Sequence, residues 1–188
     1  DGEILLAGAH IFSGYWNNPE ATAEALEADG WFHTGDIGEI DDDGYVFITG
    51  RKKELIVTAA GKNVAPAVLE DKIRASSLVS QAMVVGDKRP HLVGLIVPDP
   101  EWMREWAAAT GVPNDEAELR GNPDFQKAVS AAVDRVNKGL ATVEKVRRVI
   151  LADEAFTVEN DQMTPSMKIR RHVLRDAYGE RLNALYRH

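Results

Sequence analysis

The fold is decided by residues 81–98, which read QAMVVGDKRPHLVGLIVP. Two largely apolar runs, residues 81–86 and 92–98, flank the turn-forming residues 87–90, a pattern typical of a β-hairpin. These residues therefore predict two adjacent strands. No apolar run in the sequence approaches the length of about 20 residues that a helix needs to cross a bilayer, so we expect no transmembrane segment.

Helical patterns surround this hairpin, because apolar residues recur at helical spacing on either side of it. The expected elements are helices at 66–75, 100–109 and 122–139, strands at 55–58 and 146–151, and a final helix from Lys168 or Arg170 to Leu185. Strands and helices mixed in this order indicate an α+β domain.

The beginning of the chain has a different character, with short strands and many turns. The expected elements are a strand at 4–8, a helix from Asn18 to Leu26, and a hairpin at 37–49 that turns at 41–44. Six glycines fall between Gly30 and Gly61, and such spacing is typical of tight bends or of a backbone that approaches a ligand closely. We place a domain boundary after Lys52, which divides the chain into residues 1–52 and 53–188.

Composition excludes several classes of protein. The 188 residues include 22 Lys and Arg against 30 Asp and Glu, a net charge of −8 that argues against a general nucleic-acid binder or a partner of anionic lipid. The absence of cysteine excludes disulfides and thiolate catalysis and suggests a reducing compartment, the cytoplasm. The five His residues show no metal-ligand spacing, so we expect no protein metal site.

Two polar clusters lie in the first part of the chain. Asp36 follows Gly35 at the expected mouth of the hairpin, where a carboxylate can accept hydrogen bonds from both hydroxyls of a ribose; a turn-capping Asp is the alternative. Arg51 and Lys53 follow Gly50 at the end of the hairpin and supply a planar donor and a mobile cation. A solvated basic turn would explain these cations equally well.

A third cluster lies near the end of the chain. Lys168 stands in the sequence Met163-Thr164-Pro165-Ser166-Met167-Lys168, just before the expected final helix. A lysine there can neutralise charge that develops on a phosphoryl or carboxyl oxygen. A cation near a helix N-terminus opposes the helix dipole, so helix stability does not explain its position. A lone surface lysine at a basic helix start, without a role in catalysis, is the alternative.

Taken in this order, the three clusters resemble the adenylate-forming (ANL) superfamily of acyl-CoA synthetases, peptide-synthetase adenylation domains and luciferases. The resemblance covers almost the whole chain and rests on residues 14–22, 30–36, 43–54 and 165–171. It implies an α+β fold in which residues 1–52 are the last β-hairpin segment of a large AMP-binding domain. Residues 53–188 would then form the small, mobile C-terminal domain of the same enzyme.

The resemblance also implies roles for individual residues. Asp36 would hold the ribose hydroxyls of ATP, and Arg51 would support the same nucleotide. Lys53 matches the hinge residue about which the small domain rotates between adenylation and thioester formation; many relatives have Asp there, although Lys also occurs. Lys168 matches the lysine that bridges the substrate carboxylate and the nucleotide phosphates. Gly61 matches a glycine that lines the passage for the pantetheine arm of coenzyme A.

Within this superfamily, residues 50–66 and the helical insertion at 100–141 look most like bacterial long-chain fatty acyl-CoA synthetases. The resemblance implies an ATP-dependent acid-thiol ligase that uses a fatty acid, ATP with Mg²⁺, and coenzyme A, and whose own N-terminal domain is its partner. Peripheral membrane contact stays open. The chain has no initiator Met and no phosphate loop, so we expect a piece of a longer enzyme that is inactive by itself.

Two alternatives remain open on sequence grounds. A fatty acyl-AMP ligase would stop at the adenylate and deliver the acyl group to a carrier protein. Gly61, with no obvious insertion between Lys53 and Pro66, favours the CoA ligase. A non-catalytic binding module would have kept the fold without the reaction, and the presence of Asp36, Arg51 and Lys168 argues against it.

Overall fold

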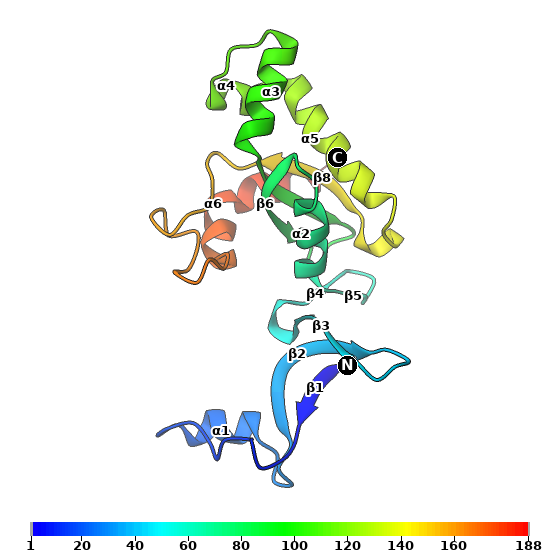
Figure 1. The fold of residues 1–188 in the computed structure, drawn as a ribbon, viewed down its shortest axis with the longest axis vertical. Helices are drawn as coiled ribbons and strands as arrows, with labels where there is room; N and C mark the ends of the chain where they lie inside the picture. The colour runs from blue at the N-terminus through cyan, green and yellow to red at the C-terminus, as the bar shows by residue number, and fades with distance from the viewer. Residues whose placement is uncertain (1, 188) are drawn as a thin grey trace. The chain divides into compact units, whose positions relative to one another are not determined.

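A computed structural model describes residues 2–187 (Figure 1). The chain divides into two compact units, residues 1–55 and 56–188. This division falls three residues after the domain boundary expected at Lys52, and that boundary remains a prediction. The first unit contains β1 (Glu3–Leu6), α1 (Pro19–Ala25), β2 (Phe32–Ile40), β3 (Val46–Arg51) and the 3₁₀-helix η1 (Lys52–Glu54).

The first unit is built on an antiparallel sheet with strand order β1-β2-β3. Its central strand β2 curves strongly (Figure 1), and its register against β3 shifts between Ile37 and Gly38. A Cβ atom at Gly38 would lie 2.7 Å from both Ile4 Cδ1 and the Phe47 carbonyl oxygen. Only glycine fits there, because β1 and β3 approach β2 from both sides.

The expected hairpin at 37–49 is confirmed, but β2 begins earlier than predicted, at Phe32. Pairing with β1 extends it, since Leu6 and Leu5 stand opposite Phe32 and His33. Asp36 pairs with Arg51, the last residue of β3, so it lies at the open end of the β2–β3 hairpin as expected. Because Asp36 is also inside strand β2, the alternative of a turn-capping Asp is excluded.

The second unit combines a two-stranded and a three-stranded sheet with helices. Its elements are β4 (Ile56–Val57), β5 (Asn63–Val64), α2 (Pro66–Arg74), β6 (Val79–Val85), β7 (Leu92–Pro98), α3 (Pro100–Thr110), α4 (Glu116–Gly121), α5 (Pro123–Asn137), the 3₁₀-helix η2 (Thr142–Glu144), β8 (Val146–Leu151) and α6 (Arg171–Ala184). The β-hairpin predicted from residues 81–98 is confirmed as β6 and β7. Strand β8 then adds to β7 in parallel.

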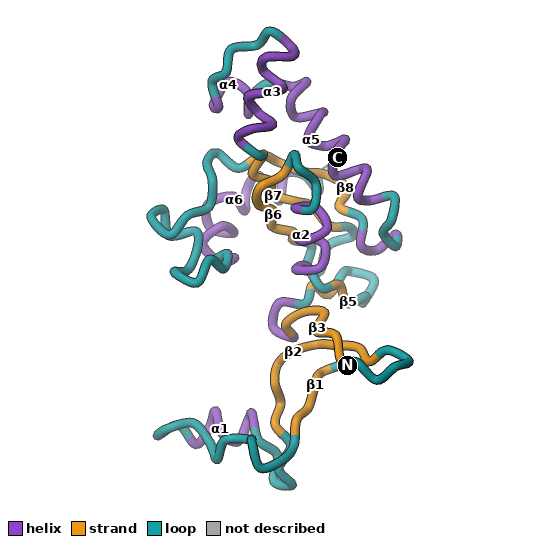
Figure 2. The backbone as a smooth tube through the Cα atoms, in the orientation of Figure 1, coloured by secondary structure: helices purple, strands orange, loops and turns teal. Residues whose placement is uncertain are grey.

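Helices cover both faces of the β6-β7-β8 sheet, which Figure 2 distinguishes by colour from the helices around it. All seven residues of the central strand β7 are buried. Leu92 and Ile96 pack on one side against residues of α2, α3 and α5, whereas Val93 and Leu95 pack on the other side against residues of α6. The α+β fold class is thus confirmed. Helix α6 packs on a hydrophobic cluster separate from the one under α2, α3 and α5.

Three helices begin with the same pair of residues, an Asn or Asp followed by Pro. Asn18, Asp99 and Asn122 each accept hydrogen bonds from backbone N–H groups of the first turn, and the proline that follows needs no such partner. These caps explain why α1, α3 and α5 begin where they do. None of the helices within residues 2–187 is both long and apolar enough to cross a membrane.

Candidate functional site

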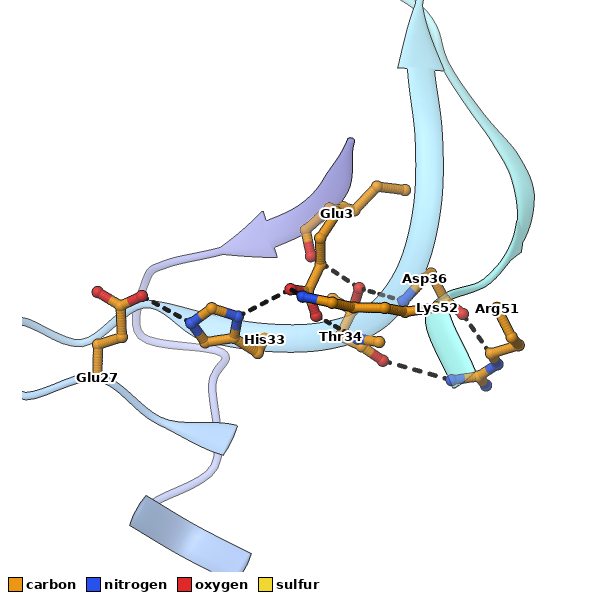
Figure 3. Close-up of polar contacts among 9 residues, drawn as sticks. Glu3, Glu27, His33, Thr34, Asp36, Arg51 and Lys52 are labelled. Carbon is orange, nitrogen blue, oxygen red and sulfur yellow. Dashed lines mark hydrogen bonds and ion pairs between the residues drawn. The ribbon is translucent and has the colours of Figure 1, made fainter. Parts of the chain in front are cut away.

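Asp36 and Arg51 are brought together in the first unit as register partners on β2 and β3. The Arg51 Nε atom lies 2.9 Å from Asp36 Oδ1, and Arg51 Nη1 donates a hydrogen bond to the Thr34 carbonyl oxygen at 3.3 Å (Figure 3). Arg51 is largely exposed, and the carboxylate keeps 22% of its side-chain surface accessible. A carboxylate that is held by one oxygen and open to solvent can accept hydrogen bonds from a neighbouring diol.

The backbone before Asp36 is fixed by Thr34. Its hydroxyl donates to the Ile4 carbonyl oxygen at 2.7 Å and accepts from the Asp36 N–H at 3.0 Å. Gly35, between them, has φ +70°, a left-handed conformation that residues with a Cβ rarely adopt. The sequence Thr34-Gly35-Asp36 therefore folds into a constrained kink that orients the Asp36 side chain.

Glu3 on β1 joins this arrangement, although sequence reasoning did not single it out. Its Oε2 accepts hydrogen bonds from Lys52 Nζ at 2.8 Å and from His33 Nδ1 at 3.0 Å, while its Oε1 accepts from the Gly35 N–H at 3.1 Å. The hydrogen bonds from Lys52 and His33 lower the pKa of the Glu3 carboxyl from 4.5 to about 2. These donors lie 30 to 49 residues further along the chain, so no local pattern could have revealed the cluster.

His33 lies between two carboxylates. Its Nδ1 faces Glu3, and its Nε2 lies 2.6 Å from Glu27 Oε1 (Figure 3). Hydrogen bonds to Glu3 and then to Glu27 raise the pKa of the imidazole above 6.5. Two acceptors are satisfied together only when both ring nitrogens carry a proton, so this position stabilises the imidazolium form.

An open hollow of about 740 Å³ lies beside this cluster in the first unit. Its lining includes Glu3, His33, Thr34, Gly35, Arg51 and Lys53. Lys53 stands in η1, is exposed, and is the last lysine before the division of the chain after Leu55. The hollow thus carries two cations of the predicted site, whereas Asp36 is not among its lining residues.

Gly61 lies in the second unit, on the turn that connects β4 and β5. Its N–H donates to the Thr58 carbonyl oxygen at 2.8 Å, and the Thr58 N–H donates to the Lys62 carbonyl oxygen at 2.9 Å. Gly61 has φ +71°, and no atom lies within 4 Å of the place a Cβ would occupy. Backbone conformation therefore selects glycine here, and the surface over the turn is open.

Lys168 lies on a loop before α6. The Thr164 N–H donates to the Lys168 carbonyl oxygen at 2.8 Å, the Lys168 N–H donates to Thr164 Oγ1 at 3.1 Å, and Met167 has φ 61°. Helix α6 begins at Arg171 with Arg170 as its N-cap residue, so the expected start near Arg170 is confirmed to within one residue, whereas a start at Lys168 is too early. Within residues 2–187 the Lys168 ammonium group makes no hydrogen bond or ion pair, and the side chain is exposed.

The Lys168 loop is anchored at its far end by a pair that sequence reasoning also missed. The buried carboxylate of Glu70 on α2 accepts hydrogen bonds from the Val84 N–H at 2.7 Å and from Arg171 Nη2 at 2.5 Å. Arg171 is the first residue of α6. The start of α6 is therefore attached to α2 and β6. The exposed Lys168 lies three residues before Arg171, where this attachment is made.

The predicted site residues thus fall into two groups. Asp36, Arg51 and Lys53 belong to the first unit, and Gly61 and Lys168 belong to the second. Within residues 2–187 no group of three or more His, Asp or Glu side chains is placed to hold a metal ion.

Comparison with known proteins places these features in a family. The sequence model described as the AMP-binding enzyme C-terminal domain matches residues 53–188. The chain belongs to this family. A long-chain-fatty-acid–CoA ligase from Mycobacterium tuberculosis is 45% identical over 188 residues, which cover 99% of this chain and 31% of the relative. Human long-chain-fatty-acid–CoA ligase 6 is 39% identical over 189 residues and is covered to 27%.

Solved structures of family relatives have the same fold. The adenylation domain of a carboxylate reductase from Mycobacterium chelonae superimposes with a TM-score of 0.81 at 31% identity, covering 98% of this chain and 27% of that domain. The corresponding domain of a carboxylic acid reductase from Segniliparus rugosus, in complex with AMP and a co-purified carboxylic acid, gives 0.81 at 29% identity. The chain spans about a third of the length of the curated relatives it matches.

Proposed function

We propose that this chain is the C-terminal part of a long-chain fatty acid–CoA ligase. The whole enzyme would join a fatty acid to ATP as an acyl-adenylate with release of pyrophosphate, and would then transfer the acyl group to the thiol of coenzyme A. The observation that carries this proposal is the Asp36–Arg51 pair, a constrained and accessible carboxylate supported by a guanidinium. It occurs in a chain that is 45% identical to a ligase of this class.

In the first half-reaction, Asp36 would accept hydrogen bonds from the ribose hydroxyls of ATP while Arg51 holds the carboxylate in place. Lys168 would donate to the fatty acid carboxylate and an α-phosphate oxygen as they approach. These groups are both anionic, and a positioned cation stabilises the transition state that joins them. Magnesium would be held by the ATP phosphates and a few solvent or protein oxygens, which is the usual preference of this ion.

In the second half-reaction, the Lys168 ammonium group has no further role at the acyl-adenylate. Rotation of the second unit about Lys53 would withdraw it and present the β4–β5 turn to the same intermediate. The open surface over Gly61 would admit the pantetheine arm, whose thiol attacks the acyl carbonyl and releases AMP. A gated rigid-body motion of this kind lets one intermediate meet two sets of side chains.

The proposed role of Lys168 can be tested because this residue would act in only the first half-reaction. In the full-length parent enzyme, Lys168→Ala should slow acyl-adenylate formation by at least about 100-fold, because a positioned charge is lost from the transition state. Thioester formation from preformed acyl-adenylate should be largely unchanged. Rapid-quench measurement of each half-reaction checks both expectations, with Lys72→Ala, an exposed lysine on α2, as the control. Equal loss in both half-reactions would contradict the role of Lys168.

The same assay separates the proposed function from a fatty acyl-AMP ligase. The open turn at Gly61 favours thioester formation, since nothing there would block a thiol substrate. Incubation of the full-length enzyme with fatty acid, ATP, Mg²⁺ and coenzyme A should therefore yield acyl-CoA. Accumulation of acyl-adenylate without acyl-CoA would favour the acyl-AMP ligase, and formation of neither product would favour a non-catalytic module.

A further inference from the structure

The two oxygens of the Glu3 carboxylate have different partners. Oε1 accepts a hydrogen bond from the Gly35 N–H at 3.1 Å, and Oε2 accepts from Lys52 Nζ at 2.8 Å and from His33 Nδ1 at 3.0 Å (Figure 3). Only 7% of the Glu3 side chain is exposed. A carboxylate with so little contact with water is costly unless its oxygens are paired, so these donors favour one position of the side chain.

The hydrogen bond from the Gly35 N–H connects Glu3 to Asp36 and Arg51, the nucleotide-contacting pair of the proposed function. Gly35 has φ +70° and immediately precedes Asp36. Glu3 holds the N–H of Gly35, and the Thr34 hydroxyl holds the N–H of Asp36, so hydrogen bonds constrain both sides of the kink. A substitution at Glu3 should therefore change the orientation of the Asp36 carboxylate.

The Lys52 contact connects the same carboxylate to the hinge. Lys52 follows Arg51 at the end of β3 and directly precedes Lys53. Its ammonium group bridges η1 to β1, two segments that lie 49 residues apart in the sequence. The Lys52 side chain remains 44% exposed, so its attachment can be removed without opening a cavity.

We propose that Glu3 is a positioning residue that couples the nucleotide-contacting pair to the hinge. One oxygen orients the backbone before Asp36, and the other anchors the residue before Lys53. This inference rests on the proposed roles of Asp36 and Lys53. A nucleotide bound at Asp36 restricts the motion of Gly35, and the hydrogen bonds of Glu3 transmit this restriction to Lys52. Nucleotide binding therefore reduces local opening of the hinge segment, Lys52 and Lys53.

The experiment uses tryptic cleavage after Lys53 in the full-length enzyme, with and without AMP. Cleavage of a native protein reports local opening of the segment that is cut. AMP should slow cleavage of the wild-type enzyme. Glu3→Gln should raise the AMP-free cleavage rate by at least about threefold and should abolish the protection by saturating AMP, because the anchor is gone. Glu39→Gln, an exposed position on the same sheet, is the matched control and should behave as wild type.

Lys52→Met removes the hydrogen bond to Glu3 from the Lys52 side. Its cleavage rate after Lys53 should rise as in Glu3→Gln, and the variant carrying both substitutions should show no further rise, because both remove the same contact between Glu3 and Lys52. The KM for ATP in adenylation should rise by about tenfold in Glu3→Ala, which lacks the oxygen that accepts from the Gly35 N–H, and should stay near wild type in Lys52→Met, which leaves that hydrogen bond in place. Calorimetric titration with AMP checks that the affinity follows the same order.

Several outcomes would overturn the inference. Equal AMP-free cleavage of Glu3→Gln and Glu39→Gln would show that Glu3 anchors nothing, and additive effects in the double variant would show that Glu3 and Lys52 act separately. A Glu3→Gln enzyme still protected by AMP would break the link between nucleotide and hinge. A wild-type enzyme that neither binds AMP nor forms acyl-adenylate would reject the proposed function, whereas the AMP-free cleavage rates would still decide whether Glu3 anchors Lys52.

Discussion

His33 is the residue whose ionisation most directly reports the Glu3 cluster. Hydrogen bonds to Glu3 and Glu27 raise its pKa above 6.5. Replacing Glu3 by Gln removes the carboxylate that contributes most, so we expect the pKa of His33 to fall in Glu3→Gln. Nuclear magnetic resonance titration of the His33 imidazole in wild type and in Glu3→Gln checks this. An unchanged titration of His33 would mean that the two side chains do not interact.

The same pKa shifts define a pH window for the stability of the β1–β2 pair. Glu3 has its pKa lowered from 4.5 to about 2, so its contribution is present above pH 4.5 and is lost as the pH falls toward 2. His33 has its pKa raised, so its contribution is present below 6.5 and is lost as the pH rises through the higher value. Hydrogen exchange of β1 and β2 amides should therefore differ most between wild type and Glu3→Gln from pH 4.5 to 6.5. The difference should vanish near pH 2.

At this scale the sequence revealed the residues that stand in recognisable local patterns and missed those that depend on the fold. Asp36 and Arg51 were found, and the register of β2 against β3 explains why they meet. Glu3 and Glu70 were not found, because their partners lie 14 to 101 residues away and only tertiary structure brings them together. A lone acidic residue in a strand or helix carries no sign of such a role.

Among the elements, α6 owes its position to a buried ion pair. Glu70 on α2 and Arg171 on α6 are both largely buried, and loss of one partner from such a pair costs about 3 kcal/mol or more. Glu70→Gln should therefore lower the free energy of local opening of β6 and α6 by about 3 kcal/mol or more, and the hydrogen-exchange rates of their amides should rise accordingly. Glu101→Gln removes the partner of Arg104 in an exposed pair and should cost less than about 1 kcal/mol. Similar costs for the two substitutions would show that burial of the Glu70 pair contributes nothing.

Elements with strong local signals were predicted well, and those set by tertiary contacts were not. The hairpin of β6 and β7 and helix α5 follow from apolar spacing and turn residues alone. The short helix α4 was missed, since it is six residues long and buries only Leu119. The parallel pairing of β8 with β7 was not predicted either, because its partner strand lies some 50 residues earlier, beyond the three intervening α-helices α3, α4 and α5.

At the scale of the whole molecule, the proposed mechanism makes Lys168 and Gly61 serve different half-reactions although both belong to the second unit. Asp36 and Arg51, in the first unit, would contact the nucleotide through both. A variant at Lys168 should therefore impair adenylation, and a variant at Gly61 should impair thioester formation. Opposite selectivity of this kind is expected only if the two units change their arrangement between the steps.

Gly61→Ala is the sharper test, because the chain offers a closely matched control. Gly61 and Gly111 both have φ 71°, and neither has an atom within 4 Å of an added Cβ. Alanine should therefore strain the backbone to the same extent at either position, by about 1 to 2 kcal/mol. Only Gly61→Ala should also slow thioester formation from preformed acyl-adenylate, by about tenfold, because a methyl group enters the proposed pantetheine passage. Single-turnover measurement of both half-reactions in full-length Gly61→Ala and Gly111→Ala tests this expectation. Equal slowing of thioester formation in the two variants would show that Gly61 matters only for backbone conformation.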